Sequence, residues 1–393
     1  MTTNAEDFKN VVSADVYKSG VLVGQLSRTG GGVEFRYRDE YAGPSVSLGL
    51  PDRGEVRGEG SGALPPFFSG LLPEGHRLIV LQRAAKTSLD DELTLLLTVG
   101  IDTPGDVQIV AHGKKLEPSP KAEVRNFDEM DFDELIDRVD PHSLPGVQIK
   151  ASDAMITNPL NSATGGGLLK LNPDAYPGLV KNEWAHLDAM RNLKIPVAQA
   201  SIVYDCKGTQ GLWVTRFDRY VDSAGEVRRL ALEDAAQIVG IPPADKYRIS
   251  AEEVAEALIE KVSSPLAAAR AIYIQFLYAW LTGNGDLHAK NISLLQRPSG
   301  QWVVAPAYDV PCTILYGDKT MALAVDGKSK GLKRTHWDNF AAFLGLNSVV
   351  IDRLNGKVLE AAQRVDLSAL GVAGSPLYAA ERELRFRRAA LEL

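Results

Sequence analysis

One short stretch of the sequence, from Leu281 to Leu295, combines polar residue types with a spacing that suits catalysis. Four side chains that can bind metals or phosphates, or move protons, fall within six residues: Asp286, His288, Lys290 and Asn291. The segments on both sides are apolar, so these groups lie between elements that we expect to be buried. Buried polar groups need partners, and a glycine-flanked turn that presents four of them indicates a functional site.

The spacing of this loop fits phosphoryl transfer. Asp286 and Asn291 are five positions apart, as are the proton-accepting aspartate and the metal-binding asparagine of kinase loops. A strand, a turn near Arg297 and a second strand then return the chain to Asp309, a candidate second Mg²⁺ ligand. An isolated Asp-x-x-x-x-Asn pattern is common by chance, and a lone His288 is more often structural, so the order of the parts matters most.

Upstream of the loop, a strand lysine and a helix glutamate are candidates for holding the phosphates of ATP. Three glycines lead into a strand with Lys170, and the helix expected over 182–194 directs Glu183 toward its buried face. Kinases use such a pair on the α- and β-phosphates. A structural ion pair, or a Glu183 that only complements the helix N-terminus, is the simpler alternative. The segment from Arg216 to Asp218 falls where a two-lobed kinase would cross between lobes and meet the adenine.

Bulk composition is that of a folded globular protein. The 393 residues are 45% hydrophobic and 24% charged, with a formal net charge of −7, which argues against nucleic-acid binding by this chain alone. The two cysteines, Cys206 and Cys312, are far apart and form neither a disulfide framework nor a metal motif. The first residues lack a signal-peptide pattern and no apolar run is long enough for a membrane span. We therefore expect a cytoplasmic protein.

The first third of the chain is expected to be α+β. Alternating apolar residues over 14–26 predict a β-hairpin, and a helix should follow from Glu74. A second helix is predicted from Ser88, as N-cap, to Val99. The acidic run 128–140 is interpreted as a solvated short helix or linker at a subdomain boundary.

The second half is expected to be mostly helical. Ser250 and Glu253 form a capping-box pattern at the start of one helix, and 266–281 is apolar on every face, which predicts a buried helix. The predicted fold class is α+β, a two-lobed protein-kinase-like fold with a β-rich N-lobe, an extra amino-terminal subdomain and a mostly α-helical C-lobe. The predicted domains are an amino-terminal subdomain (1–135), a kinase N-lobe core (136–222) and a helical C-lobe (223–393).

Four motifs together resemble the HipA family of serine/threonine kinase toxins. They are Gly-Asp286-Leu-His288-Ala-Lys290-Asn291-Ile-Ser, Tyr308-Asp309, Ser143-x-x-Gly146-x-Gln148-x-Lys150 and Phe68-x-x-Leu71-Leu72-Pro73. The resemblance covers nearly the whole chain. It implies a fold distantly similar to that of the phosphatidylinositol 3/4-kinases, and ATP and Mg²⁺ as cofactors.

The resemblance also implies roles for individual residues. Asp286 would be the catalytic base, Lys290 would lie near the transferred group, Asn291 and Asp309 would bind Mg²⁺, and Ser143 would be autophosphorylated. The implied ATP-binding set is Lys150, Lys170, Glu183, Arg216, Phe217, Asp218, His288 and Tyr308. Family members act with a small helix-turn-helix antitoxin through which they reach DNA, and an aminoacyl-tRNA synthetase is a candidate substrate. No membrane partner is implied.

Two other functions stay open at this point. A lipid or small-molecule kinase could use the same loop, and an inactive kinase fold could serve only as an antitoxin-bound co-repressor. A Walker A loop is excluded, because Ala322 stands where such a motif before Gly327-Lys328-Ser329 requires glycine. The arginine-rich stretch 381–388 is interpreted as a solvated helix face, with antitoxin contact as the alternative.

Overall fold

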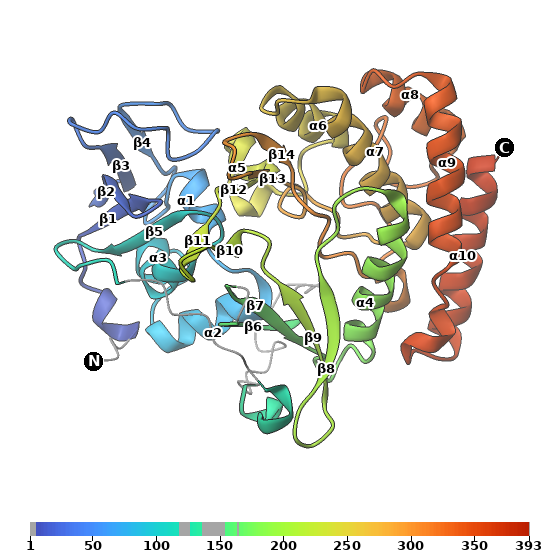
Figure 1. Ribbon diagram of the computed structural model, residues 1–393, viewed down its shortest axis with the longest axis horizontal. Coiled ribbons are helices and arrows are strands. Elements are labelled where there is room, and N and C mark those ends of the chain that lie inside the picture. Colours follow the sequence, from blue (N-terminus) through green and yellow to red (C-terminus); the bar gives the residue numbers. More distant parts are fainter. Residues whose placement is uncertain (1–4, 118–125, 136–153, 163–164, 393) are drawn as a thin grey trace.

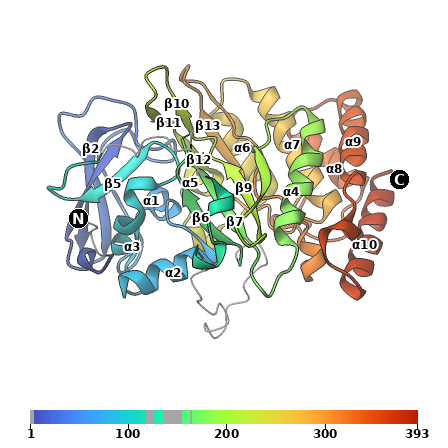
Figure 2. The same ribbon diagram turned by 60° about the horizontal axis from the view of Figure 1, so that its bottom comes forward.

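The computed structural model describes residues 5–117, 126–135, 154–162 and 165–392 (Figure 1). Helices and antiparallel sheets occur in separate parts of the chain, which confirms the predicted α+β class. Figure 2 shows these parts in a row, with the amino-terminal sheet at one end, the middle strands next and the C-terminal helices at the other end. Within the described residues, no helix is both long and apolar enough to cross a membrane.

The amino-terminal domain is a five-stranded antiparallel sheet, in the order β4-β3-β2-β1-β5, with three short helices. Its elements are η1 (Ala5–Phe8), β1 (Ser13–Lys18), β2 (Val21–Thr29), β3 (Gly32–Tyr37), β4 (Glu55–Arg57), α1 (Pro66–Gly70), α2 (Gly75–Ala85), α3 (Glu92–Val99), η2 (Gly100–Asp102) and β5 (Val107–Ala111). The alternating pattern over 14–26 does form the β1–β2 hairpin. Apolar side chains from the sheet and from α1 and α3 form one core.

The prediction that Ser88 caps the following helix is wrong. The helix begins at Glu92, and Asp91 is its N-cap, because the Asp91 carboxylate accepts the Thr94 amide. The same carboxylate also accepts hydrogen bonds from Thr87 and Arg28, at 2.7 and 2.6 Å. These long-range and local partners fix Asp91 at the helix start, whereas Ser88 lies in the preceding turn.

The acidic segment contains two 3₁₀ turns in its described part, η3 (Phe127–Glu129) and η4 (Phe132–Leu135), rather than an α-helix. Phe132 is fully buried against the second sheet, and its amide donates to Asp205 at 2.9 Å. Phe127 also packs on Trp213 of that sheet, with ring centroids 5.3 Å apart. The segment is therefore attached to the sheet by two aromatic side chains, while the acidic Asp128 remains exposed.

The second sheet has four antiparallel strands in the order β6-β7-β9-β8. Its elements are β6 (Ile156–Leu160), β7 (Gly167–Leu171), α4 (Leu179–Met190), η6 (Arg191–Leu193), β8 (Ala200–Tyr204) and β9 (Gln210–Thr215). Strand β7 begins with Gly167. A larger residue does not fit at this position, because a Cβ there would lie 2.2 Å from the Trp213 ring. Helix α4 packs on β8 and β9, so residues of β7 and α4 face each other.

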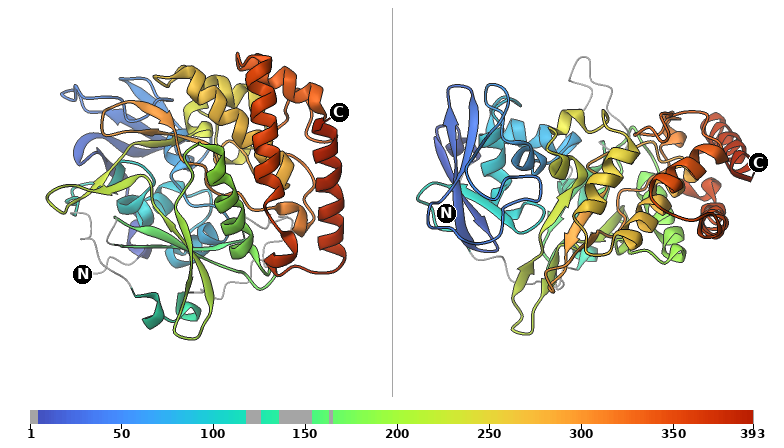
Figure 3. Two further views of the ribbon diagram at one scale, coloured as in Figure 1. Left: turned by 45° about the vertical axis from the view of Figure 1, so that its right-hand side comes forward. Right: turned by 90° about the horizontal axis from the view of Figure 1, so that it is seen from above.

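The C-terminal half is mostly helical, around a long buried helix. Its elements are β10 (Arg219–Val221), β11 (Val227–Arg229), β12 (Leu232–Asp234), α5 (Ala235–Val239), η7 (Pro243–Asp245), α6 (Ala251–Glu260), α7 (Pro265–Thr282), β13 (Ser293–Gln296), β14 (Trp302–Val304), η8 (Thr313–Tyr316), α8 (Arg334–Phe343), α9 (Ser348–Gln363), η9 (Leu367–Leu370) and α10 (Ser375–Glu392). The predicted capping box of Ser250 and Glu253 and the predicted buried helix α7 are both present. Figure 3 shows α9 and α10, in red, together at the end remote from the amino-terminal sheet.

The C-terminal arginine stretch is not entirely a solvated face. Arg387 on α10 is buried and donates to the carbonyls of Trp280, near the end of α7, and of Lys319, at 2.9 and 2.7 Å. A cation near a helix C-terminus satisfies carbonyls that have no partner within the helix. This contact helps to hold α10 on the helix that leads into the loop between α7 and β13.

The amino-terminal domain docks on the C-terminal half through hydrogen bonds to buried side chains. Glu233 accepts the Ser47 hydroxyl at 2.6 Å and the Leu48 amide at 3.0 Å, and Gln237 donates to the carbonyl of Phe67 at 2.9 Å. These contacts bring α1 and the start of α2 close to the loop after α7.

Candidate active site

The loop between α7 and β13 is held in shape by its own amide groups. Helix α7 ends at Gly283, whose φ of 74° places it in the left-handed region that favours glycine. Asn284 accepts the Asp286 amide at 2.8 Å and donates to the Asp309 carbonyl at 3.3 Å. Asn291 donates to the Asp286 carbonyl at 2.8 Å, which leaves the amide oxygen of Asn291 as its acceptor. Sequence reasoning did not identify Asn284, although its side chain links the backbone of Asp286 to that of Asp309.

Asp286 is buried, and two aromatic residues surround it. Its Oδ1 accepts the Tyr247 hydroxyl at 2.9 Å, and the His288 Nε2 lies 3.9 Å away. Burial, with the nearby Lys246 ammonium, lowers the pKa of His288 to about 3, so the imidazole is neutral at neutral pH. Its Nδ1 accepts the Lys290 amide at 3.2 Å, and its ring meets Tyr247 edge-on. These contacts give His288 a role in loop architecture.

The ion pair expected between Lys170 and Glu183 is present, and Asp309 joins it. The Lys170 Nζ lies 2.7 Å from a carboxylate oxygen of each partner. Burial disfavours the charged lysine, but the Asp309 and Glu183 carboxylates outweigh burial and raise the pKa of Lys170. Burial likewise opposes ionisation of Asp309, yet Lys170 holds its pKa below the usual range. Glu183 bears more of the burial cost, which raises its pKa to about 6. Lys170 of β7 thus connects the second sheet to Asp309, which lies beside the loop.

The side chains of Lys290 and Tyr308 bond to neighbouring segments and so hold the loop in place. The Lys290 ammonium donates to the Gly70 carbonyl at 2.8 Å and to Asp234 at 3.1 Å. The Tyr308 hydroxyl contacts the Lys290 carbonyl at 2.8 Å and the Ser293 hydroxyl at 2.6 Å. The geometry therefore assigns the Lys290 side chain an anchoring contact to the amino-terminal domain.

Of the three residues expected at the adenine, two direct their side chains to the amino-terminal domain. Arg216 pairs with Asp102 at 2.9 Å, and Asp218 accepts the Gly105 amide at 2.8 Å. Burial opposes ionisation of Asp218, but Arg216 and a second arginine hold its pKa well below the usual range. The Phe217 ring lies beside that of Tyr308, with the two ring centroids 5.7 Å apart.

A cavity of about 170 Å³ unites the residues that could transfer a phosphoryl group. Four of the predicted residues line it: Asp286, His288, Asn291 and Asp309. Five further lining residues were not predicted, namely Met155 and Thr157 beside or on β6, and Pro73, Glu74 and Arg77 from the amino-terminal domain. The Phe-x-x-Leu-Leu-Pro motif directly precedes Glu74 in the sequence, but nothing in its spacing places it near the loop between α7 and β13.

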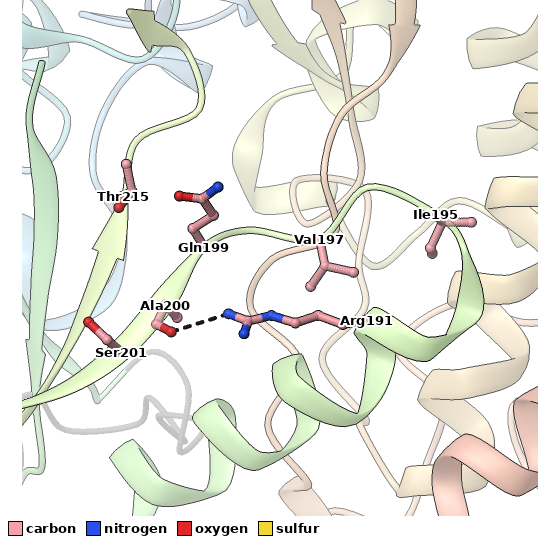
Figure 4. Close-up of a pocket in the computed structure, with 7 residues that line it drawn as sticks. All are labelled: Arg191, Ile195, Val197, Gln199, Ala200, Ser201 and Thr215. Carbon is pink, nitrogen blue, oxygen red and sulfur yellow. Dashed lines mark hydrogen bonds between the residues drawn. The ribbon is translucent and has the colours of Figure 1, made fainter. Parts of the chain in front are cut away.

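A second hollow, of about 540 Å³, lies between the end of α4 and the strands β8 and β9 (Figure 4). Arg191 reaches across it and donates to the Ala200 carbonyl at 3.3 Å. Among the described residues that line this hollow there is no carboxylate, the group that would serve as general base or as the charged Mg²⁺ ligand. The smaller cavity is the candidate active site.

The small cavity suits Mg²⁺ held jointly with phosphates. Asn291 and Asp309 supply oxygen ligands, which Mg²⁺ prefers, and Mg²⁺ commonly takes one or two protein ligands and completes its shell with phosphates and water. Within the described part of the chain, no cluster of three or more histidine, cysteine or acidic residues could form a metal site by itself. Ser143 and Lys150 lie outside the described residues.

An antiparallel sheet that carries a lysine–glutamate ion pair, followed by a helical part with an Asp-x-x-x-x-Asn loop, defines the class of kinase-like folds. Residues 142–366 match the HipA-like C-terminal domain, and residues 14–110 match the HipA N-terminal domain. The chain therefore belongs to the HipA family.

Individual relatives agree with this assignment. The chain is 27% identical over 370 residues to Y4mE of Sinorhizobium fredii, named as a candidate kinase, with 86% of this chain and 87% of that protein covered. It is 26% identical over 353 residues to the serine/threonine-protein kinase toxin HipA of Shewanella oneidensis, with 80% and 79% covered. The fold matches that of HipA in a solved Shewanella oneidensis complex of HipA, HipB and operator DNA, with a TM-score of 0.71, 22% identity and 96% of both chains covered.

Proposed function

We propose that this protein is an ATP- and Mg²⁺-dependent serine/threonine protein kinase that acts as the toxin of a toxin–antitoxin pair. The observation that carries the proposal is the meeting of Asp286, Asn291 and Asp309 at one cavity, with Lys170 bonded to Asp309 at 2.7 Å. Phosphoryl transfer needs mainly positioning and charge stabilisation, and these groups can provide both.

Each residue has a chemical task in the proposed reaction. Asp286 accepts the proton of the substrate hydroxyl while the γ-phosphoryl group passes to that oxygen and ADP leaves. Lys170 holds the phosphates, and Asn291 and Asp309 hold Mg²⁺, which would supply charge stabilisation at the phosphates. Tyr247 keeps the Asp286 carboxylate in place through its hydroxyl.

The proposed partners follow from family membership. A small helix-turn-helix antitoxin, comparable to the HipB of the solved complex, would link the kinase to operator DNA. The proposed substrate is a component of translation, with an aminoacyl-tRNA synthetase as the first candidate to assay. Autophosphorylation at Ser143 is part of the same proposal.

The test is transfer of label from γ-labelled ATP with Mg²⁺, using protein shown by mass to be unphosphorylated at the start. We expect labelled wild type, no label on Asp286→Asn, and no autophosphorylation of Ser143→Ala. Asp39→Asn is a matched control, because Asp39 is exposed in the amino-terminal domain and does not line the cavity. An unlabelled wild type would refute the kinase and favour an inactive co-repressor. Label retained by Ser143→Ala would remove only the autophosphorylation site.

A further inference from the structure

Arg77 brings a positive charge from the amino-terminal domain to the candidate active site. It lies on the first turn of α2 and lines the same cavity as Asp286, Asn291 and Asp309. Helix α2 contacts β6, and Thr157 of β6 also lines the cavity. Figure 1 shows α2 next to β6 and β7. The arginine therefore reaches the reaction centre from a domain separate from the other candidate residues.

The start of α2 is fixed on both sides of the turn that precedes it. Glu74, the N-cap residue of α2, accepts the Lys246 ammonium at 3.1 Å. Lys246 directly precedes Tyr247, whose hydroxyl bonds to Asp286. At the other side, the carbonyl of Gly70, the last residue of α1, accepts the Lys290 ammonium. Two buried lysines of the C-terminal half therefore position the segment that carries Arg77.

The Arg77 guanidinium has no anionic partner among the described residues. No carboxylate lies within 4 Å of it there, and Glu74, which also lines the cavity, is paired with Lys246. Burial lowers the pKa of Arg77, and the nearby Arg216 acts in the same direction, while Asp102 opposes them. A guanidinium nevertheless stays protonated at neutral pH. Arg77 is partly buried at the cavity, and a partly buried cation without an anion is unfavourable, so this position suits an anion that arrives with a ligand.

The size and lining of the cavity indicate which anion this is. Its volume of about 170 Å³ corresponds to about six water molecules, which is room for a phosphoryl group but not for a whole nucleotide. A planar guanidinium donates two parallel hydrogen bonds to a phosphate, a geometry that a lysine cannot reproduce. The other lining residues include the proposed base and both proposed Mg²⁺ ligands.

We propose that Arg77 is a catalytic residue that binds the terminal phosphate of ATP and stabilises the charge on the phosphoryl group during transfer. The amino-terminal domain thereby completes the active site. This inference rests on the proposed kinase function, because it assigns the anion to that reaction.

The experiment compares two nucleotides that differ in the terminal phosphate. Binding of AMP-PNP and of ADP, each with Mg²⁺, is measured by calorimetry for wild type, Arg77→Ala and Arg77→Lys. We expect Arg77→Ala to weaken AMP-PNP binding about 10- to 100-fold, the effect of losing a charged hydrogen bond, and to leave ADP binding within about twofold. The AMP-PNP affinity of Arg77→Lys should fall between those of the wild type and Arg77→Ala. Arg83→Ala is the matched control, because Arg83 is exposed on the same helix and does not line the cavity.

The rate of transfer provides a second readout. We expect Arg77→Ala to lower kcat by about 10²- to 10³-fold, with partial recovery when guanidinium ion is added at concentrations that leave the fold intact. Equal loss of affinity for both nucleotides, or no loss for either, would overturn the role of Arg77 while wild-type activity still supports the kinase. A wild type that binds neither nucleotide would instead overturn the kinase function on which the inference rests.

Discussion

Replacing Lys290 by methionine distinguishes an anchoring lysine from a catalytic one. The ammonium lies 3.1 Å from Asp234 and 2.8 Å from the Gly70 carbonyl, and only 8% and 11% of the two charged side chains is exposed. Burial opposes the charged lysine, but Asp234 outweighs it and raises the pKa of Lys290. Burial also raises the pKa of Asp234, and Lys290 does not fully offset that. The charged form of Lys290 is stabilised in the folded protein, whereas the charged form of Asp234 is destabilised. These two effects oppose each other, so the intact pair adds little net stability.

Breaking the pair should be much more costly than its net contribution suggests. Removal of one partner leaves the other charge buried, which typically costs about 3–5 kcal/mol. We therefore expect Lys290→Met and Asp234→Asn each to lower the free energy of unfolding by about that amount. The double variant should lose less than the sum, with a coupling energy of about 1–3 kcal/mol.

The assay is urea denaturation followed by tryptophan fluorescence, with phosphoryl transfer from γ-labelled ATP measured on the same preparations. Lys261→Met is a suitable control, because Lys261 is an exposed lysine at the end of α6. The reasoning is refuted if Lys290→Met unfolds within about 0.5 kcal/mol of wild type while phosphoryl transfer is lost. That outcome would restore the lysine to the reaction itself.

Two further predictions concern Glu233 and Tyr247. Burial raises the pKa of Glu233 from 4.5 to about 7, so the folded state binds more protons than the unfolded state between these values and the free energy of unfolding should fall as pH rises through this window. Glu233→Gln should flatten this dependence in urea titrations at pH 5 and pH 8, and an unchanged slope would contradict the assignment. Tyr247→Phe removes the hydrogen bond to Asp286 and should lower kcat about 10-fold with little change in AMP-PNP affinity, and a variant with wild-type kcat would exclude a positioning role.

The sequence by itself determined the elements whose signals are local. The apolar run of α7, the capping box at Ser250 and the β1–β2 hairpin all formed as predicted, because periodicity and capping act within a few residues. The facing of Lys170 and Glu183 was also predictable, since strand and helix periodicity fix which side chains point inward.

Tertiary structure decided which partners the long charged side chains contact. Lys290 is bonded to a carbonyl 220 positions away, and Arg387 to one 107 positions away. Arg77 lines the cavity on a helix whose N-cap residue is bonded to Lys246, far along the chain. A long side chain can satisfy its charge in many ways that sequence spacing does not distinguish, and only the packing of the amino-terminal domain on the helical half selects one of them.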